Sequence, residues 1–254
     1  MILKPKILNL GCGSKIHSKM INIDFFPLHS SVIKCNLLEP LSFKNNSIDL
    51  IYHANLLEHF DRYDGYKFLK DNYRILKKDG ILRISVPNLE NICREYIKIL
   101  DKKKINKKKL LWIKIELLDQ IARNKPGGEM SEILNKKNFL KSYIKQRIGN
   151  FKIKKEFLIN KMSLNRVIKK MWTIILGTLS QNWKIGKFRS SGEVHLWMYD
   201  QFSLKEILYE IGFKKINLVN PYKSSSKWWL DNNLDISENG FPCDPNNLFL
   251  EAKK

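Results

Sequence analysis

The sequence predicts an α/β fold built on a doubly wound, mostly parallel sheet. Short apolar runs alternate with helical patterns through about the first 90 residues, and each run ends in glycine or in a polar residue. A late pair of strand-like runs follows a lysine-rich helical stretch over residues 90–190. In a chain that alternates strand and helix, the crossovers make neighbouring strands parallel.

The apolar runs place the strands of this sheet. We expect strands at residues 6–10, 20–24, 32–35, 48–52, 81–86, 215–219 and 248–252. They make a seven-stranded sheet whose last two strands form a late antiparallel pair.

Two helices flank the strands. Tyr66, Leu69, Tyr73 and Leu76 recur at helical spacing, and residues 77–80 are expected to end that helix because lysines and glycine suit a helix C-terminus. Ser203 and Glu206 match a capping box, which predicts the start of a second helix that ends at Gly212. Residues 221–247 are predicted to be a loop.

Length and hydropathy predict one catalytic domain over residues 1–254, with residues 90–190 as a helical insertion or cap. No apolar run reaches the roughly 20 residues that span a bilayer. The apolar run at residues 171–176 is expected to be core, with docking on a membrane surface as the alternative.

The charge and the cysteines indicate where the protein works. The formal net charge of +21 comes mostly from lysine. It is expected to reflect solvated faces, and the alternative is an anionic partner such as nucleic acid. The four cysteines are scattered and no secretion signal is apparent, so we expect free thiols in the cytoplasm, with peripheral attachment at the inner membrane as an alternative.

Glycine and acid at two strand ends predict a nucleoside site. Gly11 and Gly13 follow the first strand and let the backbone turn sharply beside a ligand. Asp24 ends the second strand, where a carboxylate can accept from ribose hydroxyls. A dinucleotide motif would place a third small residue at Ile16, so its absence favours S-adenosyl-L-methionine over a nicotinamide cofactor.

The order of these motifs resembles class I S-adenosylmethionine-dependent methyltransferases of the type 11 group. The resemblance rests on residues 7–13, 21–24, 57–59 and 76–82. Residues 117–123, 127–130, 192–200 and 244–251 also resemble a subgroup associated with bacterial surface-polysaccharide biosynthesis. The resemblance implies a Rossmann-like fold and methyl transfer to an oxygen or nitrogen of a small-molecule or glycan acceptor.

The resemblance also implies roles for individual residues. It places Gly11, Cys12 and Gly13 around the methionine part of the cofactor and Asp24 on the ribose. The other cofactor residues that it implies are Asn9 at the methionine ammonium, Asn36 and its neighbour Leu37 at the adenine, and Asn55 in the segment 54–57 that borders the methyl-transfer cleft.

Catalysis would consist mainly of holding an acceptor in line with the methyl group, and a hydroxyl acceptor would also need a base. His195 and His59 are the candidates, although each also has a structural interpretation. Glu58 either orients the cofactor or opens a helix, and Arg123 either faces the acceptor or lies in a surface turn. No metal site is expected. The alternative functions are an RNA methyltransferase and a catalytically silent binding protein of the same fold.

Overall fold

The computed structural model describes residues 4–136, 139–149 and 177–254. These residues form two compact units. Unit 1 comprises residues 4–94, 146–149 and 196–254, and unit 2 comprises residues 95–136, 139–145 and 177–195. The single domain with an insertion at residues 90–190 stays a prediction. The apolar run at 171–176 lies outside the described residues.

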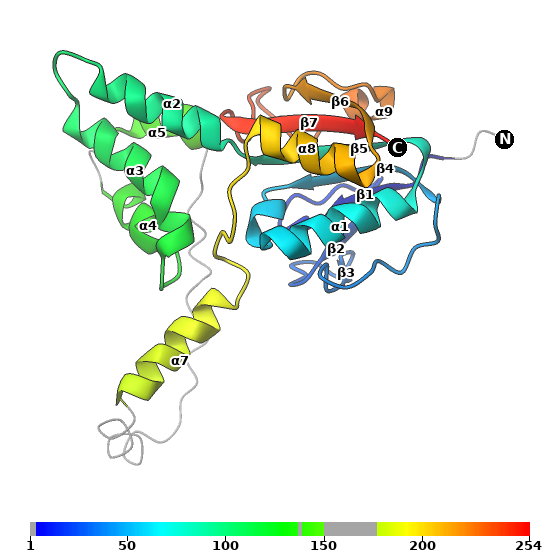
Figure 1. Cartoon of the computed structure of the whole chain (residues 1–254), viewed down its shortest axis with the longest axis horizontal. Coiled ribbons are helices and arrows are strands. Elements are labelled where there is room, and N and C mark those ends of the chain that lie inside the picture. Colours follow the sequence, from blue (N-terminus) through cyan, green and yellow to red (C-terminus); the bar gives the residue numbers. More distant parts are fainter. Residues whose placement is uncertain (1–3, 137–138, 150–176) are drawn as a thin grey trace. The chain divides into compact units, whose positions relative to one another are not determined.

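Unit 1 contains a seven-stranded sheet in the order β3-β2-β1-β4-β5-β7-β6 (Figure 1). The strands β1 to β5 pair in parallel, and β7 pairs antiparallel with both β5 and β6. The bounds are β1 Ile7–Leu10, β2 Ile21–Asp24, β3 Ile33–Lys34, β4 Ile48–Ala54, β5 Leu76–Pro87, β6 Lys214–Val219 and β7 Asn247–Lys253. This order confirms the Rossmann-like fold with a late antiparallel pair.

Alternating side chains give the sheet two covered faces. Leu8 and Leu10 of β1 pack in one core with Leu69 of helix α1 (Arg62–Ile75) and Leu204 of helix α8 (Gln201–Ile211). Ile7, which directly precedes Leu8 on β1, packs in a second core with Tyr52 and the fully buried Trp229 of helix α9 (Lys227–Asp231). Since successive side chains of a strand point to opposite faces, helices cover both sides of the sheet.

The C-terminal end of helix α1 differs from the prediction. Helix α1 stops at Ile75, and residues 77–80 belong to β5 instead of ending the helix. Leu76 already pairs with Ile48, and a register shift follows before Leu50 pairs with Ile81. The left-handed residue in this stretch is Asp79, with φ 61°, and not Gly80. Lys77, Lys78 and Gly80 therefore lie where the pairing of β5 with β4 is irregular, and not at the end of a helix.

Helix α8 begins earlier than the capping box predicted. Its N-cap is Asp200, whose Oδ1 accepts from the amides of Phe202 and Ser203 at 2.8 and 2.9 Å. The Ser203 hydroxyl donates back to Oδ2 of Asp200 at 3.0 Å. The capping-box assignment to Ser203 and Glu206 was wrong, because the carboxylate three residues earlier satisfies the amides first. Gly212, with φ 113°, ends the helix as predicted.

The segment 220–246 is held to the sheet by a buried charge network. Arg83 of β5 is fully buried and pairs with Asp235 and Glu251, both at 2.7 Å. The Tyr52 hydroxyl donates to Asp235 at 2.7 Å, and Ser225 donates to Glu251. Since each charge has a partner and further hydrogen bonds, the segment predicted as a loop is anchored to β4, β5 and β7.

Unit 2 is helical, as predicted for this part of the chain. It contains helices α3 (Lys107–Ala122), α4 (Gly128–Leu134) and α7 (Gly177–Arg189), while α2 (Leu89–Leu100) and α5 (Lys141–Ile148) include residues of both units. In the part of the chain that the structure describes, none of the helices is long and apolar enough to cross a membrane.

Candidate functional site

The candidate site lies at the edge of the sheet where the parallel strands end. Because β2, β1 and β4 are neighbours and run in parallel, the segments that follow them leave the sheet at the same edge. These segments carry Gly11 and Gly13 after β1, Asp24 at the end of β2 and Asn55 after β4. Four of the predicted cofactor residues therefore share one edge.

The turn after β1 depends on glycine at two positions. Gly11 and Gly13 have φ of 62° and 51°, a region that favours glycine. A Cβ on Gly11 would lie 2.7 Å from a methyl carbon of Leu56, whereas a Cβ on Gly13 would meet nothing within 4 Å. Gly11 thus allows close packing under the turn, and Gly13 faces open space where a ligand can approach the backbone.

Asp24 closes the turn from the neighbouring strand. Its Oδ2 accepts from the amide of Gly13 at 2.8 Å, and its Oδ1 accepts from the amide of Phe26 at 2.8 Å. A carboxylate has about four lone-pair sites. Both oxygens therefore keep acceptor capacity for hydroxyl groups of a bound nucleoside.

Asn9 is buried, and its side-chain amide is engaged by other residues of the protein. It is 2% exposed, and its Nδ2 donates to the carbonyl of Lys15 at 2.7 Å and to Oδ1 of Asn22 at 3.0 Å. Asn22, its partner in register on β2, donates in turn to the carbonyls of His17 and Met20. The two asparagines fix the course of the loop between β1 and β2.

Asn36 and Leu37 follow β3 and differ in exposure. Asn36 is exposed, and its Oδ1 accepts from the amide of Leu38 at 3.2 Å. The Leu37 side chain is buried in the main core. Of the two residues, Asn36 has the side chain that is accessible from solvent.

Asn55 belongs to a small polar group at the ends of β4, β5 and β7. It has a left-handed backbone, with φ 50°, and its amide donates to the carbonyl of Ser85 at 2.9 Å. The Nδ2 of Asn247 donates to Oδ1 of Asn55 at 2.8 Å and to Oγ of Ser85 at 3.0 Å. This places the segment before β7 next to the candidate site.

The segment 220–246 contacts the loop after β1 at three points. Lys15 pairs with Asp244 at 2.9 Å, Lys19 donates to Oδ1 of Asn232 at 3.0 Å, and the ring of His17 meets Trp228 edge-on at 5.9 Å. None of these residues was predicted from the sequence to belong to the site. Their partners lie more than two hundred positions away, so no local pattern could indicate the contacts.

Cys12, between the two glycines, holds a protonated thiol. It is buried, and burial raises its pKa to about 11, with the charge of Asp24 acting in the same direction. A thiol in this state is a poor nucleophile. Cys12 therefore contributes shape to the turn and no reactivity.

The short helix η1 (Leu57–His59) places Glu58 and His59 directly after the site segment. Glu58 is 1% exposed, and neither carboxylate oxygen has a hydrogen-bond partner within the described residues. Burial raises its pKa to about 8. A buried carboxyl of this kind holds its proton near neutral pH.

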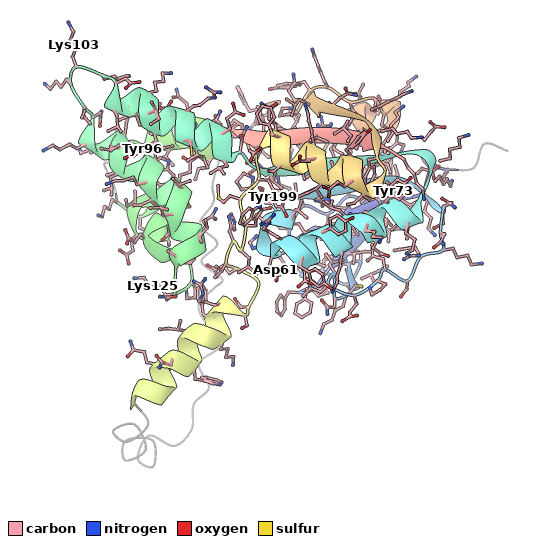
Figure 2. The ribbon with its side chains drawn as sticks, viewed as in Figure 1. Asp61, Tyr73, Tyr96, Lys103, Lys125 and Tyr199 are labelled. Carbon is pink, nitrogen blue, oxygen red and sulfur yellow. The ribbon has the colours of Figure 1, made fainter. Side chains whose placement is uncertain are left out.

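The backbone of Glu58 ties η1 to the segment before α8. Its carbonyl accepts from the amides of Leu196 and Trp197 at 2.8 and 3.2 Å. Tyr199, labelled in Figure 2 with the α1 N-cap Asp61, is buried, and a Cβ on Gly65 would lie 2.8 Å from its hydroxyl. The start of α1 can approach this segment closely only because residue 65 is glycine.

The histidines occupy different surroundings. His59 is partly exposed in η1, where its amide donates to the carbonyl of Leu56 at 3.0 Å. His195 is buried in unit 2, where its amide donates to the carbonyl of Gln120 at 3.0 Å. His53 is fully buried on β4, and burial lowers its pKa to about 3, so it stays neutral in the core.

Arg123 has a structural role within unit 2. Its guanidinium is nearly buried and pairs with Asp119 at 2.6 Å and with Glu193 at 3.1 Å. Glu193 also accepts from the amide of Gly127, and Asp119 accepts from the amide of Glu129. The arginine holds the start of α4 to α3.

One family model matches the part of the chain that carries the glycine turn and Asp24. Residues 8–84, less than half of the chain, match the family model described as a methyltransferase domain. The matched stretch contains the glycine turn, Asp24 and Asn55. The match and the geometry together support S-adenosyl-L-methionine as the cofactor.

Solved structures that resemble the chain include two methyltransferases covered over most of their length. A SAM-dependent methyltransferase from Archaeoglobus fulgidus is 14% identical, with 98% of this chain and 86% of that chain covered and a TM-score of 0.43. One from Thermotoga maritima, described as a possible histamine N-methyltransferase, is 15% identical. The match covers 100% of this chain and 84% of that chain, with a TM-score of 0.45.

A third is phosphoethanolamine N-methyltransferase 2 of Haemonchus contortus in complex with S-adenosyl-L-methionine, 13% identical, with 100% of this chain and 49% of that chain covered and a TM-score of 0.39. None of the three reaches a TM-score of 0.5, so the support for S-adenosyl-L-methionine as the cofactor rests on the strand order, the site and the family model. No curated protein matches the chain.

Proposed function

We propose that the chain is an S-adenosylmethionine-dependent methyltransferase that transfers a methyl group to an oxygen or nitrogen of a small molecule or saccharide precursor. The observation that carries the proposal is the hydrogen bond from the Gly13 amide to Asp24 at 2.8 Å. It joins a glycine turn and an acid at the ends of neighbouring parallel strands, where such folds bind nucleosides.

The residues present fit the adenosine part of the cofactor. Asp24 would accept from the ribose hydroxyls with its remaining lone pairs, and the exposed Asn36 amide would pair with the adenine edge. The open space above Gly13 would admit the chain that carries the sulfur. The bound cofactor would supply a methyl group already activated on a sulfonium, so the protein need not activate it.

The protein's own task would be to hold an acceptor and to receive its proton. His59, next to the segment 54–57, is the proposed base in unit 1, and His195 is a proposed acceptor-site residue in unit 2. Glu58 is a further proton carrier in η1, since its pKa of about 8 lies near neutral pH. Binding in a site that excludes water would align the acceptor with the methyl group.

Calorimetry followed by a transfer assay tests the proposal. The wild-type protein should bind S-adenosylmethionine and S-adenosylhomocysteine and should move labelled methyl groups from S-adenosylmethionine to saccharide precursors. Folded protein that binds neither compound would refute the proposal and favour a silent binding protein. Transfer to RNA but to no saccharide would refute the acceptor class alone.

An RNA acceptor is the second candidate, and exposed lysines of unit 2 favour it. Lysines 102, 103 and 104, between α2 and α3, and lysines 107 and 108, at the start of α3, are all exposed, and Figure 2 labels Lys103 among them. Binding that neutralises phosphates weakens steeply as salt rises. RNA binding with such a salt dependence would support this candidate, whereas weak binding at every salt concentration would exclude it. A cytoplasmic location is part of both proposals.

A further inference from the structure

Two opposite charges meet at the glycine turn. The Lys15 Nζ lies 2.9 Å from Oδ2 of Asp244, although the two residues are 229 positions apart. Both side chains are partly exposed, 37% and 25%, so a ligand can reach them. Burial alone would lower the pKa of Lys15, but the Asp244 carboxylate outweighs it and raises that pKa, so the lysine stays charged.

The protein fixes the position of each charge. The Lys15 amide donates to the carbonyl of Cys12 at 2.8 Å, and the Lys15 carbonyl accepts from Asn9 at 2.7 Å. The Asp244 carbonyl accepts from the amide of Asn247 at 3.2 Å, and the Asn247 side chain is held at the ends of β4 and β5. The pair is therefore preorganised at the edge of the sheet.

The pair lies on the side of the turn opposite to Asp24. In the strand order, β2 with Asp24 lies on one side of β1, and β4 and β5 lie on the other. Asn247 connects the Asp244 segment to β4 and β5, so Asp24 and Asp244 flank the turn from opposite sides. A ligand held by Asp24 at its ribose would extend across Gly13 toward Lys15 and Asp244.

Each charged group has hydrogen-bonding capacity left. A lysine ammonium has three donors, and Lys15 directs one to Asp244. Within the described residues, Oδ1 of Asp244 accepts no hydrogen bond. An α-amino acid has an ammonium and a carboxylate on adjacent atoms, and a lysine and aspartate side by side complement those two charges.

We propose that Lys15 and Asp244 bind the amino-acid end of the cofactor, with its carboxylate on Lys15 and its ammonium on Asp244. This inference rests on the proposed function, because it assumes that the ligand is S-adenosylmethionine. Asn9 does not supply this charge, since it is neutral and its amide nitrogen is engaged by Lys15 and Asn22. The segment 220–246 thereby becomes part of the cofactor site.

Two probes separate the amino-acid end from the rest of the cofactor. S-adenosylhomocysteine contains the amino acid, and 5′-methylthioadenosine has the adenosine and the sulfur without it. Calorimetry of both with Asp244→Asn and with Lys15→Gln should show S-adenosylhomocysteine weakened by about 10- to 100-fold, as expected for a lost charged hydrogen bond. Binding of 5′-methylthioadenosine should stay within about twofold of the wild type.

Lys19→Gln is the matched control. Lys19 belongs to the same loop and also contacts the segment 220–246, but through the neutral Asn232. Its substitution should leave the affinity for both probes unchanged. Thermal unfolding of each variant shows whether the fold is kept, and if Asp244→Asn does not fold, Lys15→Gln tests the same pair by itself.

The results distinguish this inference from the proposed function. If folded Asp244→Asn and Lys15→Gln bind S-adenosylhomocysteine as tightly as the wild type, the inference is overturned and the proposed function stands. Equal weakening of both probes also overturns it, because the pair would then act on the loop as a whole. Wild-type protein that binds neither probe refutes the proposed function itself.

Discussion

The Gly13 amide and the Asp24 carboxylate lie 2.8 Å apart, so the glycine turn after β1 and the acid that ends β2 form one hydrogen-bonded unit. The same carboxylate holds the amide of Phe26 at the start of the next loop. A change at Asp24 therefore affects the site in two ways, through the turn and through the ligand.

Replacing Asp24 by alanine should weaken S-adenosylhomocysteine and 5′-methylthioadenosine alike, by about 10- to 100-fold, because both contain the ribose. Calorimetry with the purified variant measures this. Asp64→Ala, which removes a partly exposed carboxylate of α1 far along the chain from the turn, should bind as the wild type does. Unchanged affinity of folded Asp24→Ala for both compounds would remove Asp24 from the site.

The two glycines of the turn should respond differently to alanine. Gly11→Ala combines a strained backbone with a Cβ 2.7 Å from the Leu56 side chain, whereas Gly13→Ala has only the strain. Gly13→Ala should cost about 1 kcal/mol of unfolding free energy and Gly11→Ala clearly more.

Urea unfolding with and without S-adenosylhomocysteine measures both glycine effects. The ligand should stabilise the wild type more than Gly13→Ala, since the new methyl group occupies the space above the turn. Equal losses of stability in the two variants would contradict the packing role of Gly11.

Removing Arg83 should destabilise unit 1 strongly. Arg83→Met leaves the buried carboxylates of Asp235 and Glu251 without their cation, and the expected loss is about 3 to 5 kcal/mol. Lys77→Met is the control, because Lys77 pairs with Asp49 at the surface and exposed pairs contribute about 0 to 1 kcal/mol. Chemical denaturation measures the free energy of unfolding of both variants. Similar losses in the two variants would show that the buried network contributes no more to stability than a surface ion pair does.

Glu58 should make the stability of the protein depend on pH above the acid range. Burial raises its pKa from 4.5 to about 8, so the folded state keeps a proton that the unfolded state has released. Its contribution is fully present below about pH 4.5 and is lost as the pH rises through about 8. Glu58→Gln should remove this loss in denaturation series at different pH.

The titration of His53 does not overlap with the effect of Glu58 above neutral pH, because His53 changes the stability only in the acid range. Its pKa falls from 6.5 to about 3 in the folded protein, so its contribution is present above about pH 6.5 and is lost as the pH falls through about 3. A wild-type protein whose stability above neutral pH equals that of Glu58→Gln would mean that Glu58 is not buried as a protonated acid.

The local pattern was enough to predict the sheet and the glycine turn. Apolar runs bounded by polar residues located β1, β2 and β4, and glycine beside an acid located the edge that Gly13 and Asp24 form. Parallel pairing then follows from the alternation of strand and helix. These features depend on residues close together in the sequence or on strand pairing alone.

Other features depend on contacts that no local pattern contains. Helix α9 has only five residues, and it is set by the Ser226 cap and by the burial of Trp229 under the sheet. Asp200 and Ser203 both suit a helix start, and only the structure shows that the carboxylate takes the amides. The pairing of Lys15 with Asp244 joins segments from opposite ends of the sequence.

The position of β7 between β5 and β6 also has a kinetic consequence. Residues of unit 2 are synthesised after β5 and before β7, so β5 emerges from the ribosome long before its antiparallel partner. Pairing over so long a separation closes a large loop and is slow. Until β7 docks, β5 has an open edge and Arg83 lacks Glu251, so a nascent chain halted before residue 247 should be a substrate for chaperones or for aggregation.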